Sequence, residues 1–349
     1  MKKYLILADG GSPHTLKWAK ELKKYFDVYI LSFNGFSDSV KEVIGNGKTY
    51  DLKVNIIVSG NNISVFKKIL RVKEIIDKID PNYINAHYIT SYGSIAIVAA
   101  MLCNYKGKII LSAWGSDILV TPFKNKLYFW LTKFCLSKSD VITSDSSCMC
   151  EVIKKIKFVN NIITFPFGVG ALPQIVEQEK NYDYFFSNRA LEENYNIDLV
   201  INIFAGIYEK NKEAKLFIAN KGSKDNKLKK LAEKLKVKDN IEFLGFLSEQ
   251  KQQYYYRKCG YYISVPKSDS TSVSLLEAMS YGCIPIVSNI PANTEWIEDK
   301  INGLYYERSK IPEFLCNAFR INREIISERA IWSNNIKKFV KIILGECYY

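Results

Sequence analysis

Short runs of apolar residues alternate along the chain with longer segments in which apolar residues recur every three or four positions. The short runs are typical of buried strands and the longer segments of amphipathic helices. In the first half, strands are predicted at Leu5–Ala8, Val28–Ser32, Val54–Val58, Tyr83–His87, Ile109–Ala113, Val141–Thr143 and Ile162–Phe165. Helices are predicted between them at Pro13–Phe26, Ile63–Ile79, Ile95–Cys103 and Lys124–Leu136.

The second half repeats this alternation, although no sequence repeat relates the two halves. Strands are predicted at Tyr184–Ser187, Lys215–Ala219, Ile241–Leu244, Tyr261–Val265 and Ile284–Ser288. Helices are predicted at Leu199–Tyr208, Lys227–Leu235, Ser248–Arg257 and Val273–Tyr281. Strands that alternate with helices favour parallel sheets with helices on both faces. The expected fold is therefore α/β, with two Rossmann-like, doubly wound domains that face each other across a cleft.

A linker-like stretch separates the two halves. Pro166, Gly168 and Gly170 follow the last strand of the first half, and a polar segment follows them. We therefore predict an N-terminal domain over residues 1–167 and a C-terminal domain over residues 168–332. Residues 333–349 are set apart, because a basic amphipathic helix is predicted at Asn335–Leu344. Three placements of this helix are open: against the first domain, on a membrane, or as a cap on the second domain.

The charge balance constrains the partners. The 349 residues include 49 Lys and Arg against 36 Asp and Glu, a net charge of +13. Such a chain suits phosphorylated substrates, an anionic membrane surface or nucleic acid, or simply carries a Lys-rich surface. No motif of an RNA- or DNA-binding module is present, so no nucleic-acid partner is expected.

Targeting and cysteine signals are weak. The apolar runs Ile95–Cys103 and Tyr4–Ala8 are too short for a membrane span and for a signal peptide, respectively. The eight Cys residues lack the paired spacing of a zinc site. We therefore expect reduced thiols and a cytoplasmic protein, and a position at the inner face of the cell membrane is left open.

The segment from Ser268 to Val287 carries the strongest chemical signal. A polar loop follows a predicted strand, Thr271 or Ser272 can cap the next helix, and Gly282 is placed to end it. Ligands of open α/β sheets bind at the carboxyl ends of strands, and a helix N-terminus there suits a diphosphate. Glu277 lies in the second turn, where a carboxylate can accept hydrogen bonds from ribose hydroxyls.

This segment resembles the signature of family 4 of the retaining glycosyltransferases, which have the GT-B fold. That signature has two acidic residues separated by seven others, as Asp269 and Glu277 are here, before Ala-Met, a Gly and a Pro-containing strand. The resemblance implies that Glu277 binds the donor ribose and that the backbone of Thr271, Ser272, Val273 and Ser274 holds the diphosphate. It also implies that Asp269 contacts the transferred sugar as a catalytic residue, although the family usually has Glu there.

Further segments in the second half resemble the same family. Arg189 follows a strand and corresponds to the Arg that neutralises the leaving diphosphate, a task suited to its forked guanidinium. The family commonly has a Lys five residues later, where this chain has Asn194. Gly245 ends a strand that resembles the one beside the nucleotide base. Phe165–Gly168 resembles the interdomain element of the family.

The first half offers candidates for the acceptor side. Gly10, Gly11 and His14 lie in a loop that follows the first strand, where glycines allow close approach of a substrate. His87 ends another strand, and Asp117 follows the strand that leads to Trp114. Asp117 is the candidate for orienting the acceptor hydroxyl or taking its proton, with His87 as a second catalytic candidate. Many family members have a His near the position of Trp114, which this chain lacks.

No metal or other cofactor is expected. GT-A enzymes use an Asp-x-Asp pair to hold a divalent cation, and no two Asp residues here are separated by one residue. A P-loop and a dinucleotide-binding glycine fingerprint are also missing. The segment Lys124–Lys133 mixes Lys with large aromatic residues. This composition fits either a helix at a membrane interface or a core helix whose lysines lie on a solvent-exposed edge.

The sequence thus predicts a retaining hexosyltransferase that moves a sugar from a nucleotide-diphosphate donor, with UDP favoured, to a saccharide or lipid-linked glycan. By analogy with the family, its role would be bacterial surface glycan synthesis. One alternative is a sugar-nucleotide epimerase on the same fold. Another is a non-catalytic anion- or membrane-binding protein, since Asp269 and Asn194 depart from the family pattern.

Overall fold

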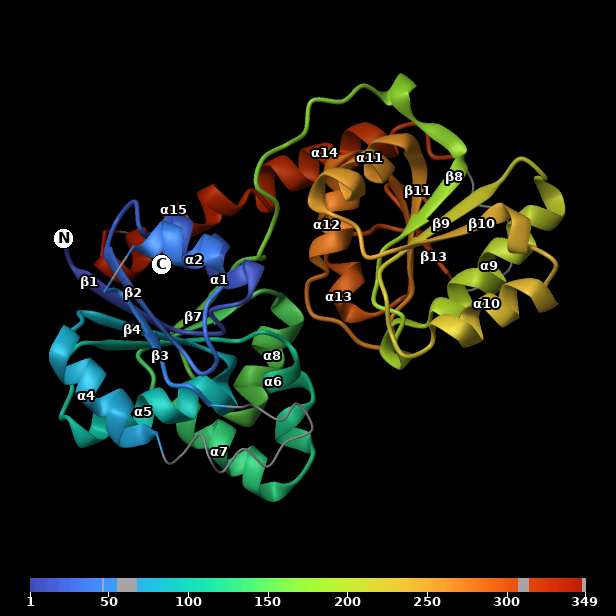
Figure 1. The fold of residues 1–349 in the computed structure, drawn as a ribbon. Coiled ribbons are helices and arrows are strands. Elements are labelled where there is room, and N and C mark those ends of the chain that lie inside the picture. The colour runs from blue at the N-terminus through green and yellow to red at the C-terminus, as the bar shows by residue number, and fades with distance from the viewer. Residues whose placement is uncertain (46, 55–67, 307–313, 347–349) are drawn as a thin grey trace. The chain divides into compact units, whose positions relative to one another are not determined.

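The computed structural model describes all residues except 46, 55–67, 307–313 and 347–349. The chain forms two compact units (Figure 1). The N-terminal unit consists of Met1–Phe165 with Ile336–Tyr349, and the C-terminal unit is Pro166–Asn335. The division falls two residues before the one that the sequence predicts. None of the described helices is long and apolar enough to cross a membrane.

The N-terminal unit is built on a parallel sheet with the strand order β3-β2-β1-β4-β5-β6-β7. The strands are β1 (Lys3–Leu7), β2 (Asp27–Ser32), β3 (Thr49–Asp51), β4 (Tyr83–His87), β5 (Lys108–Ser112), β6 (Val141–Ser144) and β7 (Ile162–Thr164). The helices are α1 (Pro13–Leu22), α2 (Asp38–Ile44), α4 (Ile69–Ile79), α5 (Ser94–Leu102), α6 (Ser116–Leu119), α7 (Lys126–Ser137) and α8 (Ser147–Ile156). A π-helical segment η1 (Tyr88–Gly93) and a 3-10 turn η2 (Thr121–Phe123) complete the list.

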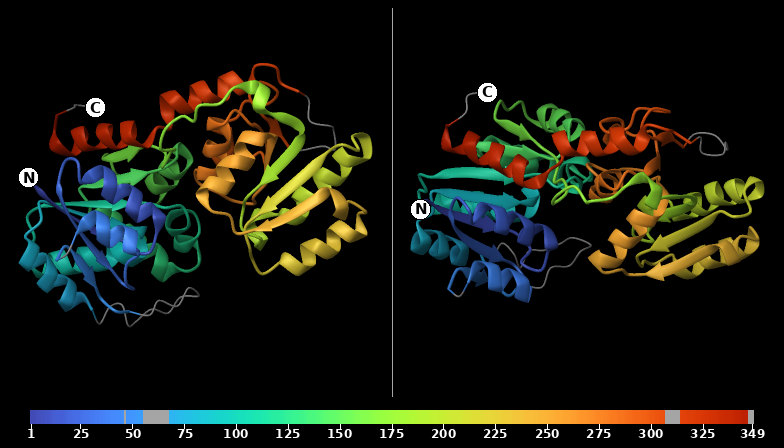
Figure 2. Two further views of the ribbon diagram at one scale, coloured as in Figure 1. Left: turned by 45° about the horizontal axis from the view of Figure 1, so that its top comes forward. Right: turned by 90° about the horizontal axis from the view of Figure 1, so that it is seen from above.

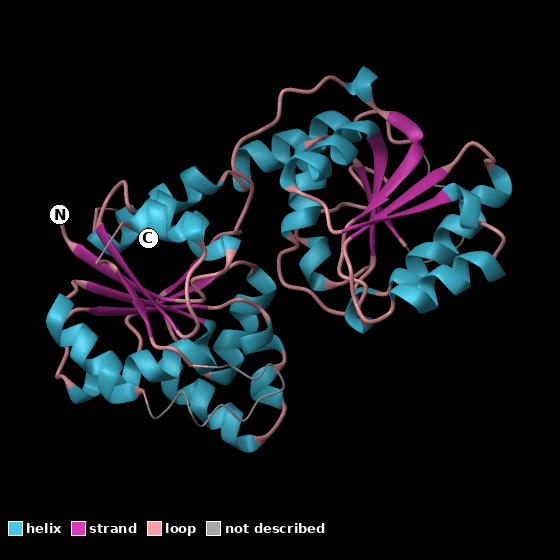
Figure 3. Ribbon diagram, in the orientation of Figure 1, coloured by secondary structure: helices cyan, strands magenta, loops and turns pink. Residues whose placement is uncertain are grey.

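Helices cover both faces of this sheet (Figure 3). One face packs Leu5, Ile84 and Leu111 against α4, α5, α7 and α8. The opposite face carries α1 and the C-terminal helix α15 (Trp332–Leu344), whose Phe339 contacts the rings of Trp18 and Phe165. The second half of α15 therefore packs against the N-terminal unit.

The C-terminal unit has a parallel sheet of the order β10-β9-β8-β11-β12-β13. Its strands are β8 (Asn181–Ser187), β9 (Lys215–Ala219), β10 (Ile241–Gly245), β11 (Cys259–Ser264), β12 (Ile284–Val287) and β13 (Leu304–Tyr305). Its helices are α9 (Ile197–Lys210), α10 (Asp225–Lys234), α11 (Glu249–Lys258), α12 (Val273–Ser280), α13 (Pro291–Thr294) and α14 (Ala318–Arg329). Helices lie on both faces of this sheet (Figure 2). One apolar cluster packs the sheet against α9 and α10, and a second packs the opposite face against α11 and α12.

The predicted two-domain α/β architecture is confirmed, and most predicted elements are present within one to three residues of their expected ends. The sequence pattern did not predict α2, β3, α8, α13, β13 and α14, which are short or have mixed apolar and polar residues. Most of the predicted strand Val54–Val58 and the start of the predicted helix Ile63–Ile79 lie outside the described residues.

Candidate active site

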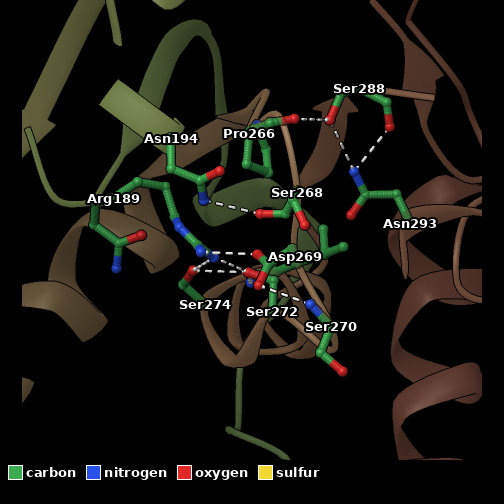
Figure 4. Close-up of polar contacts among 12 residues, drawn as sticks. Arg189, Asn194, Pro266, Ser268, Asp269, Ser270, Ser272, Ser274, Ser288 and Asn293 are labelled. Atoms are coloured by element: carbon green, nitrogen blue, oxygen red, sulfur yellow. Dashed lines mark hydrogen bonds and ion pairs between the residues drawn. The ribbon is translucent and has the colours of Figure 1, made fainter. Parts of the chain in front are cut away.

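Two neighbouring strands of the C-terminal unit bring Arg189 and Asp269 together. β8 and β11 pair in parallel, so the loops after Ser187 and Ser264 leave the same edge of the sheet. Figure 4 shows Arg189 extending from the first loop toward Asp269 and the residues that begin α12. The predicted diphosphate-binding Arg and the first predicted acidic residue are therefore direct neighbours.

The guanidinium of Arg189 is held by several contacts. Its Nη2 lies 2.8 Å from Oδ2 of Asp269, and its Nη1 donates to the hydroxyls of Ser272 and, at 3.2 Å, Ser274. One face of the guanidinium stacks on the ring of Tyr195, with 4.5 Å between the guanidinium carbon and the ring centroid. Burial alone would lower the pKa of Arg189, but Asp269 together with the nearby Tyr262 and Tyr195 outweighs burial, so this pKa is raised. Arg189 is thus a fixed, permanently charged group.

The start of α12 lies beside this cation. Ser272 caps the helix, because its hydroxyl accepts a hydrogen bond from the backbone N–H of Leu275 at 3.3 Å. Thr271 precedes this cap, Val273 and Ser274 begin the first turn, and Ser274 accepts a hydrogen bond from Arg189 through its hydroxyl. A helix N-terminus carries partial positive charge, which adds to that of the guanidinium. Together they form a site suited to an anionic phosphate group.

A second network holds Glu277, one turn farther along α12. The hydroxyl of Tyr256 lies 3.1 Å from Oε2 of Glu277, and it also contacts the Ser274 carbonyl and the Asn188 amide. Tyr262 donates to Asn188 and Ser274, both at 2.9 Å. Burial raises the pKa of Tyr262 to about 12 and raises that of Tyr256 well above its usual value, so both phenols stay protonated as donors.

Asn188, Tyr256 and Tyr262 were not predicted as site residues. Asn188 precedes Arg189 at the carboxyl end of β8, which is the position where functional residues of such sheets gather. Tyr256 is on α11 and Tyr262 lies inside β11, and in the sequence both look like core residues. Only the folded chain shows that their hydroxyls reach Glu277 and Ser274.

Asn194, which stands where the family commonly has Lys, has a structural contact. Its side-chain amide donates to the backbone carbonyl of Ser268 at 2.9 Å, and its backbone carbonyl accepts from the backbone N–H of Lys267. Figure 4 shows this contact beside Arg189. The position that would supply a second cation instead fixes the loop between β11 and α12. Gly245 ends β10, which is separated from β8 by β9, so it lies apart from this cluster.

The N-terminal unit has a pocket at the carboxyl ends of β1 and β4. It is lined by Ala8, Asp9, Ser12, His14, Thr15, His87, Tyr88 and Trp114. The imidazoles of His14 and His87 both lie next to the Trp114 ring, with centroid distances of 5.1 and 5.2 Å. Tyr88 has a φ of 64°, a strained conformation for a bulky residue that is often found at functional sites. The structure therefore joins both predicted His residues in one aromatic pocket.

His87 is a buried, neutral base. Only 2% of its surface is exposed, and burial, assisted by His14, lowers its pKa to about 3. Its Nε2 has no hydrogen-bond partner among the described residues. Burial also lowers the pKa of His14, and Lys17 adds to this shift. Both rings are thus neutral at pH 7 and can exchange hydrogen bonds with an uncharged hydroxyl.

Asp117 holds two loops in place. Its side chain is buried, and its two oxygens accept hydrogen bonds from the backbone N–H groups of Ile89, at 2.8 Å, and Trp114, at 2.9 Å. Burial raises the pKa of this carboxyl group. These contacts favour a role in positioning Trp114 and the segment after His87. A role for Asp117 as a catalytic base stays a prediction.

The two predicted glycines differ in their surroundings. A Cβ on Gly10 would lie 2.3 Å from the Gly35 carbonyl oxygen and from the Phe36 ring. The close approach of the loop after β2 therefore requires a glycine at position 10. A Cβ on Gly11 would meet only the Asp9 carboxylate, at 3.4 Å. Gly10 is therefore explained by packing, whereas Gly11 has space for an approaching group.

Potential metal ligands are scattered in the described part of the chain, where no group of three His, Cys, Asp or Glu side chains is placed to hold an ion. The groups that face the predicted diphosphate position are instead Arg189 and the first turn of α12.

Comparison with known proteins agrees with this geometry. Residues 3–146 match the family described as glycosyl transferase 4-like, and residues 171–338 match glycosyl transferases group 1. The two matches follow each other and together cover most of the chain. The chain belongs to the group 1 glycosyltransferases. The recognition of the family from the Asp269–Glu277 segment is thereby confirmed.

Relatives and solved structures extend this result. An alpha-monoglucosyldiacylglycerol synthase of Streptococcus pneumoniae is 30% identical over 139 residues, which are 38% of this chain and 32% of that protein. An uncharacterized glycosyltransferase of Methanocaldococcus jannaschii is 28% identical over 88% of this chain and 82% of its own length. The crystal structure of Anabaena HepE with UDP superposes with a TM-score of 0.75 at 11% identity, over 99% of this chain and 100% of HepE. This glycosyltransferase therefore has the predicted GT-B fold.

Proposed function

We propose that this glycosyltransferase transfers a hexose from a UDP-sugar to a saccharide or lipid-linked glycan, with retention of anomeric configuration. The observation that carries the proposal is the position of Arg189 at the N-terminus of α12, one turn before Glu277. The fixed cation and the helix terminus offer a site for the diphosphate, and Glu277 offers an acceptor for ribose hydroxyls. HepE, which shares the fold, is described in complex with UDP.

The proposed reaction needs no nucleophile from the enzyme. The acceptor oxygen bonds to the anomeric carbon on the face that the diphosphate leaves, the bond from that carbon to the diphosphate oxygen breaks, and the acceptor proton passes to the departing phosphate. Arg189 stabilises the charge that develops on the diphosphate, which is the usual way in which fixed charges accelerate such a step. The positive charge in this proposal comes from the protein rather than from a metal ion.

The remaining predicted residues take roles on the acceptor side. Gly11 leaves space beside the loop after β1, and the neutral rings of His14 and His87 can bind hydroxyl groups of the acceptor. On the donor side, Asp269, which is paired with Arg189, takes the role of contacting the transferred sugar. The alpha-monoglucosyldiacylglycerol synthase among the relatives supports a lipid-linked acceptor, and a cytoplasmic location remains expected.

The test combines thermal unfolding with turnover. The protein is mixed with UDP, GDP, ADP, CMP and their sugar conjugates, beside the Glu277→Ala variant. A nucleotide at 100 times its dissociation constant should stabilise the folded state by about 2.7 kcal/mol. We expect UDP and UDP-sugars to do so in the wild type and not in Glu277→Ala.

Turnover separates the alternatives. A transferase releases UDP from its donor only at a low rate until a hydroxyl acceptor is added. An epimerase would convert the nucleotide sugar without any acceptor, and a non-catalytic protein would bind it without converting it. Either outcome would overturn the proposal.

A further inference from the structure

Three large apolar side chains lie uncovered on one edge of the N-terminal unit. Phe123 at the end of η2 is 62% exposed, and Leu127 and Trp130 on α7 are 75% and 61% exposed. Leu127 and Trp130 are three residues apart on α7 and therefore share one side of that helix. Phe123 lies in η2, which precedes α7 and packs against it. We call them the apolar ridge.

The helix that carries the ridge is fixed by its other side. Thr132, Cys135 and Leu136 of α7 are buried, and the last two belong to the core that α7 shares with α4, α5 and α8. In Figure 1, α7 lies with α4 and α5 in the outer helical layer of this unit. Rotating α7 to bury Leu127 and Trp130 would expose that core. The ridge is therefore a stable feature of the folded surface.

The surroundings of the ridge are basic. The chain from Ile118 to Ser139 contains Lys124, Lys126, Lys133 and Lys138 and no acidic residue. Asp117, just before it, is buried. The ammonium group of Lys133 lies 4.9 Å from the centroid of the Trp130 ring, so positive charge directly adjoins the apolar surface.

We propose that the apolar ridge with its flanking lysines is a docking surface for an anionic lipid bilayer. Exposed apolar residues beside lysines match the boundary between acyl chains and charged headgroups, and Trp favours that boundary. Each Lys near an anionic bilayer adds to the attraction. Polyanions without an apolar layer, such as nucleic acids, would leave Phe123, Leu127 and Trp130 in water. The proposal does not depend on the proposed transferase activity.

Trp130 provides a direct readout. The chain has five Trp residues, of which Trp18, Trp296 and Trp332 are buried and Trp114 is half-buried. Addition of vesicles that contain phosphatidylglycerol should shift the emission of Trp130 to shorter wavelength, and brominated acyl chains should quench it. Vesicles of phosphatidylcholine alone should have little effect. Replacement of Trp130 by Phe should remove the spectral change while the protein still sediments with the vesicles.

Variants then test the surface itself by co-sedimentation. The double variant Phe123→Ser/Leu127→Ser should lower the partition coefficient for phosphatidylglycerol vesicles by about tenfold or more, because two apolar side chains that would be buried in the bilayer are lost. The triple variant Lys124→Gln/Lys126→Gln/Lys133→Gln should lower it too and reduce its dependence on salt. Phe158→Ser is the matched control, because Phe158 is a 73% exposed Phe of the same unit that lies outside the ridge.

The outcomes separate clearly. Loss of vesicle binding in the ridge variants with retention in Phe158→Ser supports the proposal. Absence of binding to phosphatidylglycerol vesicles, equal binding to both vesicle types, or equal loss in Phe158→Ser overturns it. Thermal stabilisation by UDP, measured on each variant, reports the nucleotide site in the other unit. A failure there would overturn the proposed function and leave the vesicle result interpretable.

Discussion

Nη2 of Arg189 lies 2.8 Å from Oδ2 of Asp269, so the cation predicted to bind the donor diphosphate is already paired with a carboxylate of the same unit. The two side chains are only 11% and 18% exposed, and the serine hydroxyls of α12 hold Arg189 on its other side. The diphosphate must therefore compete with Asp269 for this guanidinium. Asp269 both positions Arg189 and opposes the charge that Arg189 is expected to bind.

Removal of the charge of Asp269 should therefore strengthen the binding of UDP. In Asp269→Asn the guanidinium keeps its serine contacts, and UDP should bind more tightly by about 1 kcal/mol, or roughly fivefold. Sugar transfer should fall, because the carboxylate proposed to contact the sugar is lost. Isothermal titration with UDP and initial rates with a UDP-sugar measure the two effects.

Arg189→Lys is the companion variant. Lysine keeps the charge but lacks the forked geometry, so UDP should bind more weakly than to the wild type. If Asp269→Asn weakened the binding of UDP as much as Arg189→Lys does, the competition between the carboxylate and the diphosphate would be disproved.

The hydrogen bond between Tyr256 and Glu277 should couple the two residues in donor binding. A double-mutant cycle with Tyr256→Phe and Glu277→Gln should give a coupling free energy of about 1 kcal/mol in the affinity for UDP. The control cycle replaces Tyr256→Phe by Tyr262→Phe, which removes a buried hydroxyl that binds Asn188 and Ser274. Its coupling to Glu277→Gln should be near zero, and equal couplings in both cycles would contradict a specific role for Tyr256.

The architecture and one part of the site could be predicted because each depends on local pattern. Strands such as the one predicted at Leu5–Ala8 are continuous apolar runs, and Asp269 and Glu277 lie in one contiguous segment with a recognisable spacing of acids. Arg189 could be added because the strand that it follows resembles the family's strand before the phosphate-binding Arg. The contact between Arg189 and Asp269 follows from the adjacency of β8 and β11, which spacing alone does not reveal.

Other features depend on tertiary contacts. Tyr256 and Tyr262 look like core residues until the structure shows where their hydroxyls point. Asp117 has the residue type of a catalytic base, but one of its oxygens accepts from the backbone N–H of nearby Trp114 and the other from that of Ile89, which is far away in the sequence. Burial of this kind cannot be derived from composition or periodicity.

The burial of His87 predicts a dependence of stability on pH. Its pKa is lowered to about 3, whereas an unfolded His titrates near 6.5. Between these values His87 binds a proton in the unfolded state but not in the folded state. The contribution of neutral His87 to stability is therefore complete above about pH 6.5 and is lost as the pH falls toward 3. The free energy of unfolding should decline by at most about 1.4 kcal/mol per pH unit from this group.

Urea unfolding between pH 4 and 7 measures this slope. The variant His87→Gln cannot titrate there, so it should lose less stability on acidification than the wild type does. His14→Gln is the control: burial and Lys17 also lower the pKa of His14, but His14 is only partly buried, whereas His87 is fully buried. We expect a smaller change in slope for His14→Gln, and identical slopes for His87→Gln and the wild type would show that His87 does not titrate as described.

The glycines after β1 should respond differently to the same small change. In Gly10→Ala the new methyl group would lie 2.3 Å from the Gly35 carbonyl oxygen, so the loop after β2 must move. Overpacking of this kind costs about 1–3 kcal/mol of unfolding free energy. In Gly11→Ala the methyl group meets only the Asp9 carboxylate at 3.4 Å, and stability should change by less than about 0.5 kcal/mol. Thermal unfolding of both variants measures the contrast.

The acceptor site gives a second measurement. If Gly11 serves that site, Gly11→Ala should raise the KM for the acceptor although its stability is nearly unchanged. An unchanged KM would limit the glycine requirement to Gly10 and its packing.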